Sequence, residues 1–348
     1  MTRRRHFPSI LQVLEGLDTK AWKTGIRRIE RLHGDAILMP SPWKSMRSMA
    51  QVLAAPPLNI DQLNLEIAGA KQRRLGVFFE ISLPNPDESM HHLSALKTFQ
   101  DRHIKPLMKL DYSGMLIGRG SNWPAAAILE LERLVRLKEG AVLFIDHGRS
   151  PDLELLDGQV DGVVDPAGVQ GITRFLKGFC SGSDLGRHLE RQQQRLGINL
   201  AGRLLNPLDL LRVDEPMVAL GSGLAFMLRG YPLLPPPPNA LPESIYGAVA
   251  QVRLDHEALE WGRFVDLSPP SNPDIFAFGR ADERKNSPVI VIARRAAGAA
   301  FSLPLGVGAY DPKRCFVDLQ GGQSEFITEN GWVDLPACDG AQLLLLGQ

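Results

Sequence analysis

The residues whose types could do chemistry stand at the ends of short apolar runs. Asp146 and His147 follow AVLFI, and a carboxyl beside an imidazole could form a polar pair that faces a ligand. The alternative is a capped turn before GRSP, where Asp is common for backbone reasons. Trp43 and Trp123 follow two other runs, and each could offer a ring face to a sugar. The alternative for both is the packing of a large amphipathic side chain at the rim.

The elements that must position these residues alternate regularly along the chain. Short apolar runs, typical of strands buried on both faces of a parallel sheet, are each followed by a longer connection, mostly of helical period. The eight runs are SILQV, DAILMP, GVFFEIS, GMLIG, AVLFID, VDGVVD, GINLAGRLL and YPLLP. Residues 1–262 are therefore predicted to form a (β/α)8 barrel, a fold of about 250 residues whose active sites lie at the carboxyl ends of the strands.

The texture changes after residue 262. Seven short runs with β propensity follow, separated by Gly, Pro, Asn and Asp, with no helical period between them. Residues 263–348 are therefore predicted to form a small antiparallel β domain, a sandwich. The stretch GYPLLPPPPNALP is interpreted as the eighth strand and its loop, because proline ends strands. A polyproline recognition segment is the alternative.

Composition excludes several classes of function. The 348 residues carry 39 basic and 39 acidic side chains, so no net charge attracts nucleic acid or an anionic membrane. No apolar run is long enough to span a membrane, and MTRRRH lacks the apolar region of a signal peptide. Three scattered cysteines argue against disulfides and a zinc site. We expect a cytoplasmic protein without metal or cofactor, and leave its oligomeric state open.

The order of several segments resembles the α-amylase family, glycoside hydrolase family 13. The first two similar segments each contain a helix and the strand that follows it. The last one resembles the family's link between the barrel and the C-terminal domain. These segments are WKTGIRRIERLHGDAILMPSP, LNLEIAGAKQRRLGVFFEISLPN, VDGVVDPAGVQGITRFLKG, LAFMLRGYPLLPP and LEWGRFVDLSPPSNPDIFAFGRADERKNSPVIVIARR. The resemblance implies a barrel that acts on α-glucosidic bonds, with an Asp nucleophile after strand four and a Glu acid/base after strand five.

The residues at those positions depart from the family's pattern. The nucleophile position is Gly118, which has no group to attack with, and the acid/base position is Asp146. The third-strand motif falls on Glu80 and Asn85. The seventh-strand motif falls on Asn206, Pro207, Asp209 and Arg212. Since retaining hydrolysis needs two carboxyl groups flanking the bond, this pattern predicts a barrel that has lost the family's catalysis.

Three hypotheses remain at this point. The first is a non-catalytic protein that binds an α-glucan, another polysaccharide or a partner protein. Its binding residues would be Trp43, Glu80, Asn85, Trp123, Asp146, His147, Asp209 and Arg212. The second is an active glycosidase or transglycosylase that uses Glu80, Asp146 and Asp209. The third is a structural subunit of a polysaccharide-handling complex.

Overall fold

A computed structural model describes most of the chain. It covers residues 7–83, 93–120, 123–147, 160–201, 203–236, 243–281, 288–305, 314–318, 327–329 and 331–347.

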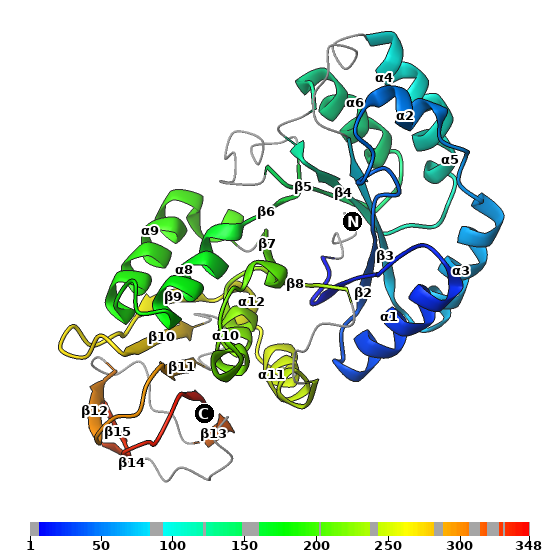
Figure 1. Cartoon of the computed structure of the whole chain (residues 1–348). Helices are drawn as coiled ribbons and strands as arrows, with labels where there is room; N and C mark the ends of the chain where they lie inside the picture. Colours follow the sequence, from blue (N-terminus) through cyan, green and yellow to red (C-terminus); the bar gives the residue numbers. More distant parts are fainter. Residues whose placement is uncertain are drawn as a thin grey trace. The chain divides into compact units, whose positions relative to one another are not determined.

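Eight strands in these residues close a barrel in chain order, β1 to β8 (Figure 1). The pairings from β1 through β6, and that of β1 with β8, are parallel. The strands are β1 Leu11–Val13, β2 Ala36–Met39, β3 Gly76–Ser82, β4 Gly114–Gly118, β5 Val142–Ile145, β6 Gly162–Val164, β7 Leu204–Pro207 and β8 Tyr231–Leu234. The predicted barrel is confirmed.

The chain divides into two compact units. The first comprises Met1–Asp165 and Leu233–Asn239, and the second comprises Pro166–Pro232 and Ala240–Gln348. This division differs from the predicted one at residue 262, because helices after β6 pack on the C-terminal sheet. The prediction that residues 1–262 and 263–348 are separate domains stays a prediction.

In the first unit, helices follow the strands and lie outside them (Figure 1). They are α1 Thr19–Arg31, α2 Met49–Ala54, α3 Ile60–Gln72, α4 Leu93–Phe99, α5 Lys105–Met108 and α6 Ala125–Arg136, with a π-helical segment at Gln100–Ile104. Inside the barrel, Phe78 of β3 meets Phe144 of β5 with ring centroids 6.1 Å apart. Because side chains alternate along a strand, Glu80 and Ser82 share the face of Phe78.

In the second unit, two antiparallel sheets follow the helices. The helices are α8 Pro166–Leu176, α9 Gly182–Ala201, α10 Glu215–Met227, α11 Glu243–Asp255 and α12 Ala258–Trp261, with a 3-10 turn at Leu208–Leu210. The five-stranded sheet has the order β13-β16-β11-β10-β9 and the three-stranded sheet β12-β15-β14. Their strands are β9 Arg263–Asp266, β10 Ile275–Ala281, β11 Val289–Arg294, β12 Phe301–Pro304, β13 Arg314–Asp318, β14 Ile327–Glu329, β15 Trp332–Leu335 and β16 Gln342–Gly347.

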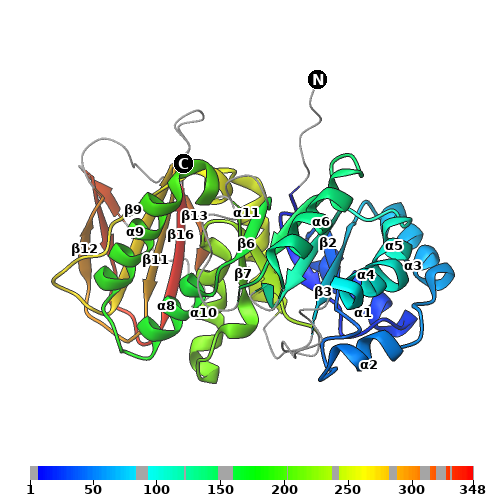
Figure 2. The same cartoon turned by 90° about the horizontal axis from the view of Figure 1, so that it is seen from above.

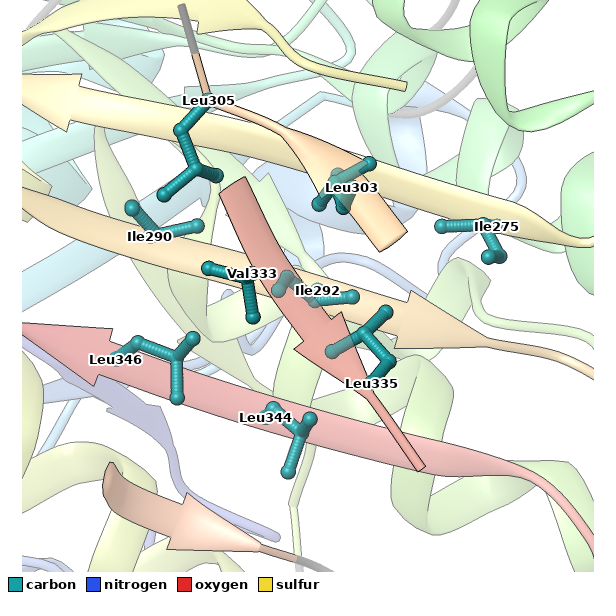
Figure 3. Close-up of a cluster of buried hydrophobic side chains, with 10 residues drawn as sticks. Ile275, Ile290, Ile292, Leu303, Leu305, Val333, Leu335, Leu344 and Leu346 are labelled. Carbon is teal, nitrogen blue, oxygen red and sulfur yellow. The ribbon is translucent and has the colours of Figure 1, made fainter. Parts of the chain in front are cut away.

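The five-stranded sheet is covered on both faces. Helices α8 and α9 lie along it, and Phe175 of α8 contacts Phe276 of β10 with centroids 5.9 Å apart (Figure 2). On the other face, alternate residues of β10, β11 and β16 pack against Leu303, Val333 and Leu335 of the smaller sheet (Figure 3). The predicted C-terminal β domain is confirmed as two packed sheets.

One predicted strand was placed wrongly. The run GINLAGRLL was expected to be the seventh strand, but helix α9 continues to Ala201 and β7 begins at Leu204. Leu185, Leu189 and Leu196 are buried at helical spacing, so the helical period reaches the residue just before the run.

The eighth strand ends as predicted, at Leu234. The carbonyl of Pro235 then accepts hydrogen bonds from Gln12 Nε2 (2.8 Å) and Arg28 Nη1 (3.0 Å). Residues 237–242, which include the remaining prolines, lie outside the described residues. Among the described helices, none is both long and apolar enough to cross a membrane.

Candidate functional site

A buried carboxylate stands near the carboxyl end of β3. The side chain of Glu80 is 6% exposed, and its Oε1 accepts a hydrogen bond from Ser82 Oγ at 2.7 Å. Lys44, in the segment after β2, places its Nζ 3.1 Å from Oε1 and 3.4 Å from Oε2. The Lys44 ammonium thus compensates a carboxylate that burial alone would destabilise.

Ser41 joins the segment after β2 to this strand. Its Oγ accepts from the backbone N–H of Ser82 at 3.1 Å and of Trp43 at 3.4 Å, and donates to the Ser82 carbonyl at 3.4 Å. Because Ser41 and Ser82 are both buried, these bonds satisfy groups that water cannot reach. These hydrogen bonds attach the segment that carries Trp43 and Lys44 to the end of β3.

Gly118 lies directly opposite Ser82 in the pairing of β3 with β4. A Cβ at position 118 would overlap Ser82 Oγ and would stand 2.8 Å from Glu80 Oε1. The position that resembles the family's nucleophile therefore has no carboxylate, and the hydroxyl and carboxylate of two β3 residues fill the adjoining space. An acidic side chain placed there would also face the charge of Glu80.

The chain turns sharply after Gly118. Arg119 adopts a positive φ of 53°, uncommon for a residue with a side chain. The turn lets Trp123 fold back so that its Nε1 donates to the Gly118 carbonyl at 3.3 Å.

Both predicted sugar-stacking residues are buried. Trp43 is 1% and Trp123 6% exposed. Trp43 packs edge-on against Phe99 (5.2 Å) and His103 (5.1 Å), and Phe99 in turn contacts Trp123 (6.2 Å). This burial favours the packing alternative, because a ring with so little exposed surface has no open face to offer a sugar. Burial, followed by the charge of Arg102, lowers the pKa of His103 in this cluster.

Asp146 and His147 follow β5 as predicted, and both are half-buried. The N–H of Asp146 donates to the Ile117 carbonyl at 2.8 Å, and its carbonyl accepts from Gly120 N–H. The backbone of Asp146 thus joins the ends of β4 and β5, which supports the turn interpretation. Nε2 of His147 is buried and has no hydrogen-bond partner among the described residues.

The predicted residues of the seventh-strand motif belong to the second unit. Asp209 and Arg212 are exposed, and Arg212 Nη1 donates to the backbone carbonyl of Asp209 rather than to its carboxylate. Asn206 is buried and donates to the Arg229 carbonyl at 2.8 Å. Asn85 lies outside the described residues.

Ser41, Lys44 and Ser82 were not predicted from the sequence. One signal was available, because residues two apart in a strand share a face and Ser82 follows Glu80 by two. The contribution of Lys44 depends on the path of the segment after β2, which no local pattern specifies. Among the described residues, no group of three His, Cys, Asp or Glu side chains could hold a metal ion.

Comparison with solved structures finds the same fold in enzymes of α-glucan metabolism. A debranching enzyme from Nostoc punctiforme is 12% identical, with 98% of each chain covered and a TM-score of 0.72. A noncanonic maltogenic α-amylase from Thermotoga neapolitana is 10% identical, over 97% of this chain and 98% of that one, with a TM-score of 0.69. A cyclic α-maltosyl-(1→6)-maltose hydrolase from Arthrobacter globiformis is 12% identical at the same coverage, with a TM-score of 0.70.

No protein-family model and no curated protein sequence matches the chain. At these identities the likeness is one of fold, and it confirms that the chain has the barrel and C-terminal β architecture of α-amylase-family enzymes.

Proposed function

We propose that this chain is a non-catalytic α-amylase-like protein that binds α-glucans in the cytoplasm. The proposal rests on position 118. A glycine stands there in place of the nucleophile, and the side chains of Ser82 and Glu80 occupy the space that a larger residue would need. The fold shared with enzymes of α-glucan metabolism supports a carbohydrate ligand. Without a carboxylate at position 118, attack on an anomeric carbon has no nucleophile.

An active glycosidase is the second candidate, because Glu80 is a carboxylate close to the nucleophile position. Its oxygens are, however, engaged by Lys44 and Ser82. Partners that stabilise the carboxylate in the resting protein also make it a weaker nucleophile. We therefore favour a role in which the Lys44–Glu80 pair offers hydrogen-bonding groups to sugar hydroxyls.

The test measures binding and turnover together. Calorimetric titration with maltoheptaose is expected to give heat of binding, while release of reducing sugar stays at the level of a blank. Lys44→Met should weaken binding several-fold, since the Lys44 side chain is the exposed member of the pair. Lys105→Met is the matched control, because Lys105 also pairs with a carboxylate and is equally exposed, on helix α5.

Two results would contradict the proposal. Hydrolysis that disappears in Glu80→Gln would establish the active alternative. Absence of binding to any maltooligosaccharide would instead favour a partner protein or a structural role in a larger complex.

A further inference from the structure

The second unit contains a buried guanidinium whose hydrogen-bonding capacity is mostly unused. Arg280 of β10 is 0% exposed and lies opposite Phe264 of β9. Its Nη2 donates to the Leu259 carbonyl at 3.1 Å. Among the residues that the structure describes, Nε and Nη1 have no hydrogen-bond partner, and no carboxylate forms an ion pair with Arg280.

Two other buried arginines stand near Arg280. Arg253 of α11 donates to the carbonyls of Phe226 (2.6 Å), Leu228 (3.0 Å) and Gly230, at the turn between α10 and β8. Arg229, in that turn, donates from Nη1 to Gln193 Oε1 at 3.1 Å. Burial, and then the charges of Arg229 and Arg253, lower the pKa of Arg280 well below its ordinary value. The three positive charges are therefore close enough to repel one another.

Arginine does not escape this repulsion by losing its proton, because a guanidinium stays protonated in proteins. A buried charge without a partner is costly, and so is a buried N–H without an acceptor. Carbonyl groups offset part of that cost for Arg253 and for one nitrogen of Arg280. The other two nitrogens of Arg280 have no acceptor among the described residues, and the neighbouring positive charges favour an acceptor that carries negative charge.

We propose that a small inorganic anion binds to Nε and Nη1 of Arg280 and is stabilised by the charges of Arg229 and Arg253. The chemistry selects an anion over a sugar or another neutral ligand, because guanidinium groups offer only donors and a hydroxyl would need acceptors as well. Complete burial of Arg280 restricts the ligand to the size of a halide or a compact oxyanion. The anion belongs to the framework of the second unit, so this site is independent of glucan binding.

Thermal unfolding of the full chain tests the site. The protein is dialysed into gluconate, an anion too large for the site, and titrated at constant ionic strength with chloride and separately with phosphate. An anion that binds the folded state raises Tm, by roughly 5 °C at a concentration 100 times its Kd. The anion with the larger effect identifies the class of ligand.

Two variants locate the effect. In Arg280→Met we expect the anion dependence of Tm to disappear. Arg294→Met is the matched control, because Arg294 of the neighbouring strand β11 is also buried and its Nε and Nη2 also lack hydrogen-bond partners. Arg294→Met should lower Tm and keep the anion dependence, because Arg294 lies opposite Ile275 of β10, five residues along the strand from Arg280.

Crystals grown with bromide give a readout that needs no variant. The expected result is an anomalous peak at hydrogen-bonding distance from Nε or Nη1 of Arg280. The proposal is overturned if Tm is equal in gluconate, chloride and phosphate. It is equally overturned if the position holds only water, or if the anion dependence persists in Arg280→Met.

Discussion

Glu80 and Arg280 are both buried charges, but the protein surrounds them in different ways. The Glu80 carboxylate has a lysine ammonium and a serine hydroxyl within hydrogen-bonding distance. The Arg280 guanidinium has one carbonyl, and its neighbours include two further positive charges. The Glu80 carboxylate thus has partners from the protein's own side chains, whereas Nε and Nη1 of Arg280 have none among the described residues. A buried charge with an internal partner needs no ligand, whereas unpartnered donors next to further positive charges favour a bound anion.

The largest expected effect comes from the aromatic cluster beside Glu80. Trp43→Ala removes a ring that is 1% exposed and contacts Phe99 and His103. Truncation of such a buried side chain leaves a cavity and costs about 3–5 kcal/mol of unfolding free energy. Urea denaturation measures this, with Trp332→Ala of β15 as the control. Trp332 is 48% exposed, so its removal should cost about 1 kcal/mol or less.

A weakening of glucan binding in Trp43→Ala without a loss of stability would restore the stacking interpretation. It would show that the ring is available to a ligand despite its burial.

The next effect tests whether the ion pair with Lys44 stabilises the buried Glu80 carboxylate. Lys44→Met leaves the Glu80 carboxylate buried beside Ser82 without its cation, and we expect a loss of about 2 kcal/mol, below the range for fully buried pairs because Lys44 is partly exposed. The double variant with Glu80→Gln should recover much of this loss, since no unpaired charge remains. If Lys44→Met and the control Lys105→Met cost the same, the pair contributes no more than a surface ion pair.

A smaller effect is expected at the glycine opposite Ser82. Gly118→Ala places a Cβ into contact with Ser82 Oγ, and overpacking of this kind costs about 1–3 kcal/mol. Adding Ser82→Gly should relieve the cost, because the hydroxyl is the nearest obstacle. Gly298→Ala is the control, because no atom lies within 4 Å of the added Cβ.

The sequence predicted the regions where one pattern decides the structure. Runs such as SPVIVIARR and QLLLLG became strands β11 and β16, because continuous apolar residues favour a sheet covered on both faces. The prediction of the seventh strand was wrong because no single pattern decides that region. GINLAGRLL is as consistent with the end of an amphipathic helix as with a strand.

The arrangement around Glu80 could not be predicted, because it depends on contacts between distant segments. The sequence placed Glu80 near the end of a strand, but Lys44 reaches it only through the path that Ser41 imposes on the segment after β2. Trp43 likewise follows a strand, as predicted, and its burial results from Phe99 and His103 of other elements. The local sequence pattern predicted where Glu80 and Trp43 lie relative to the strands, but it did not predict which side chains surround them.

The smallest expected effect is a pH dependence from His103 in the aromatic cluster beside Glu80. His103 is 2% exposed between Trp43 and Phe99, and burial lowers its pKa from the ordinary value of 6.5. The unfolded chain therefore binds a proton more readily than the folded chain. The stability that the neutral ring provides is complete above pH 6.5 and decreases as pH falls below 6.5 toward the lower folded-state value. One such group changes stability by at most about 1.4 kcal/mol per pH unit.

His103→Phe, which keeps a ring in the cluster, should reduce the slope of unfolding free energy against pH between 6.5 and 5.5. The pKa of His256 in the second unit is also lowered, by burial first. His256→Asn is therefore the matched variant: it should reduce the slope separately, and the two reductions should add because the residues belong to different units. An unchanged slope in His103→Phe would mean that the ring is solvated or already protonated in the folded protein, and that the aromatic cluster is less tightly closed than its burial indicates.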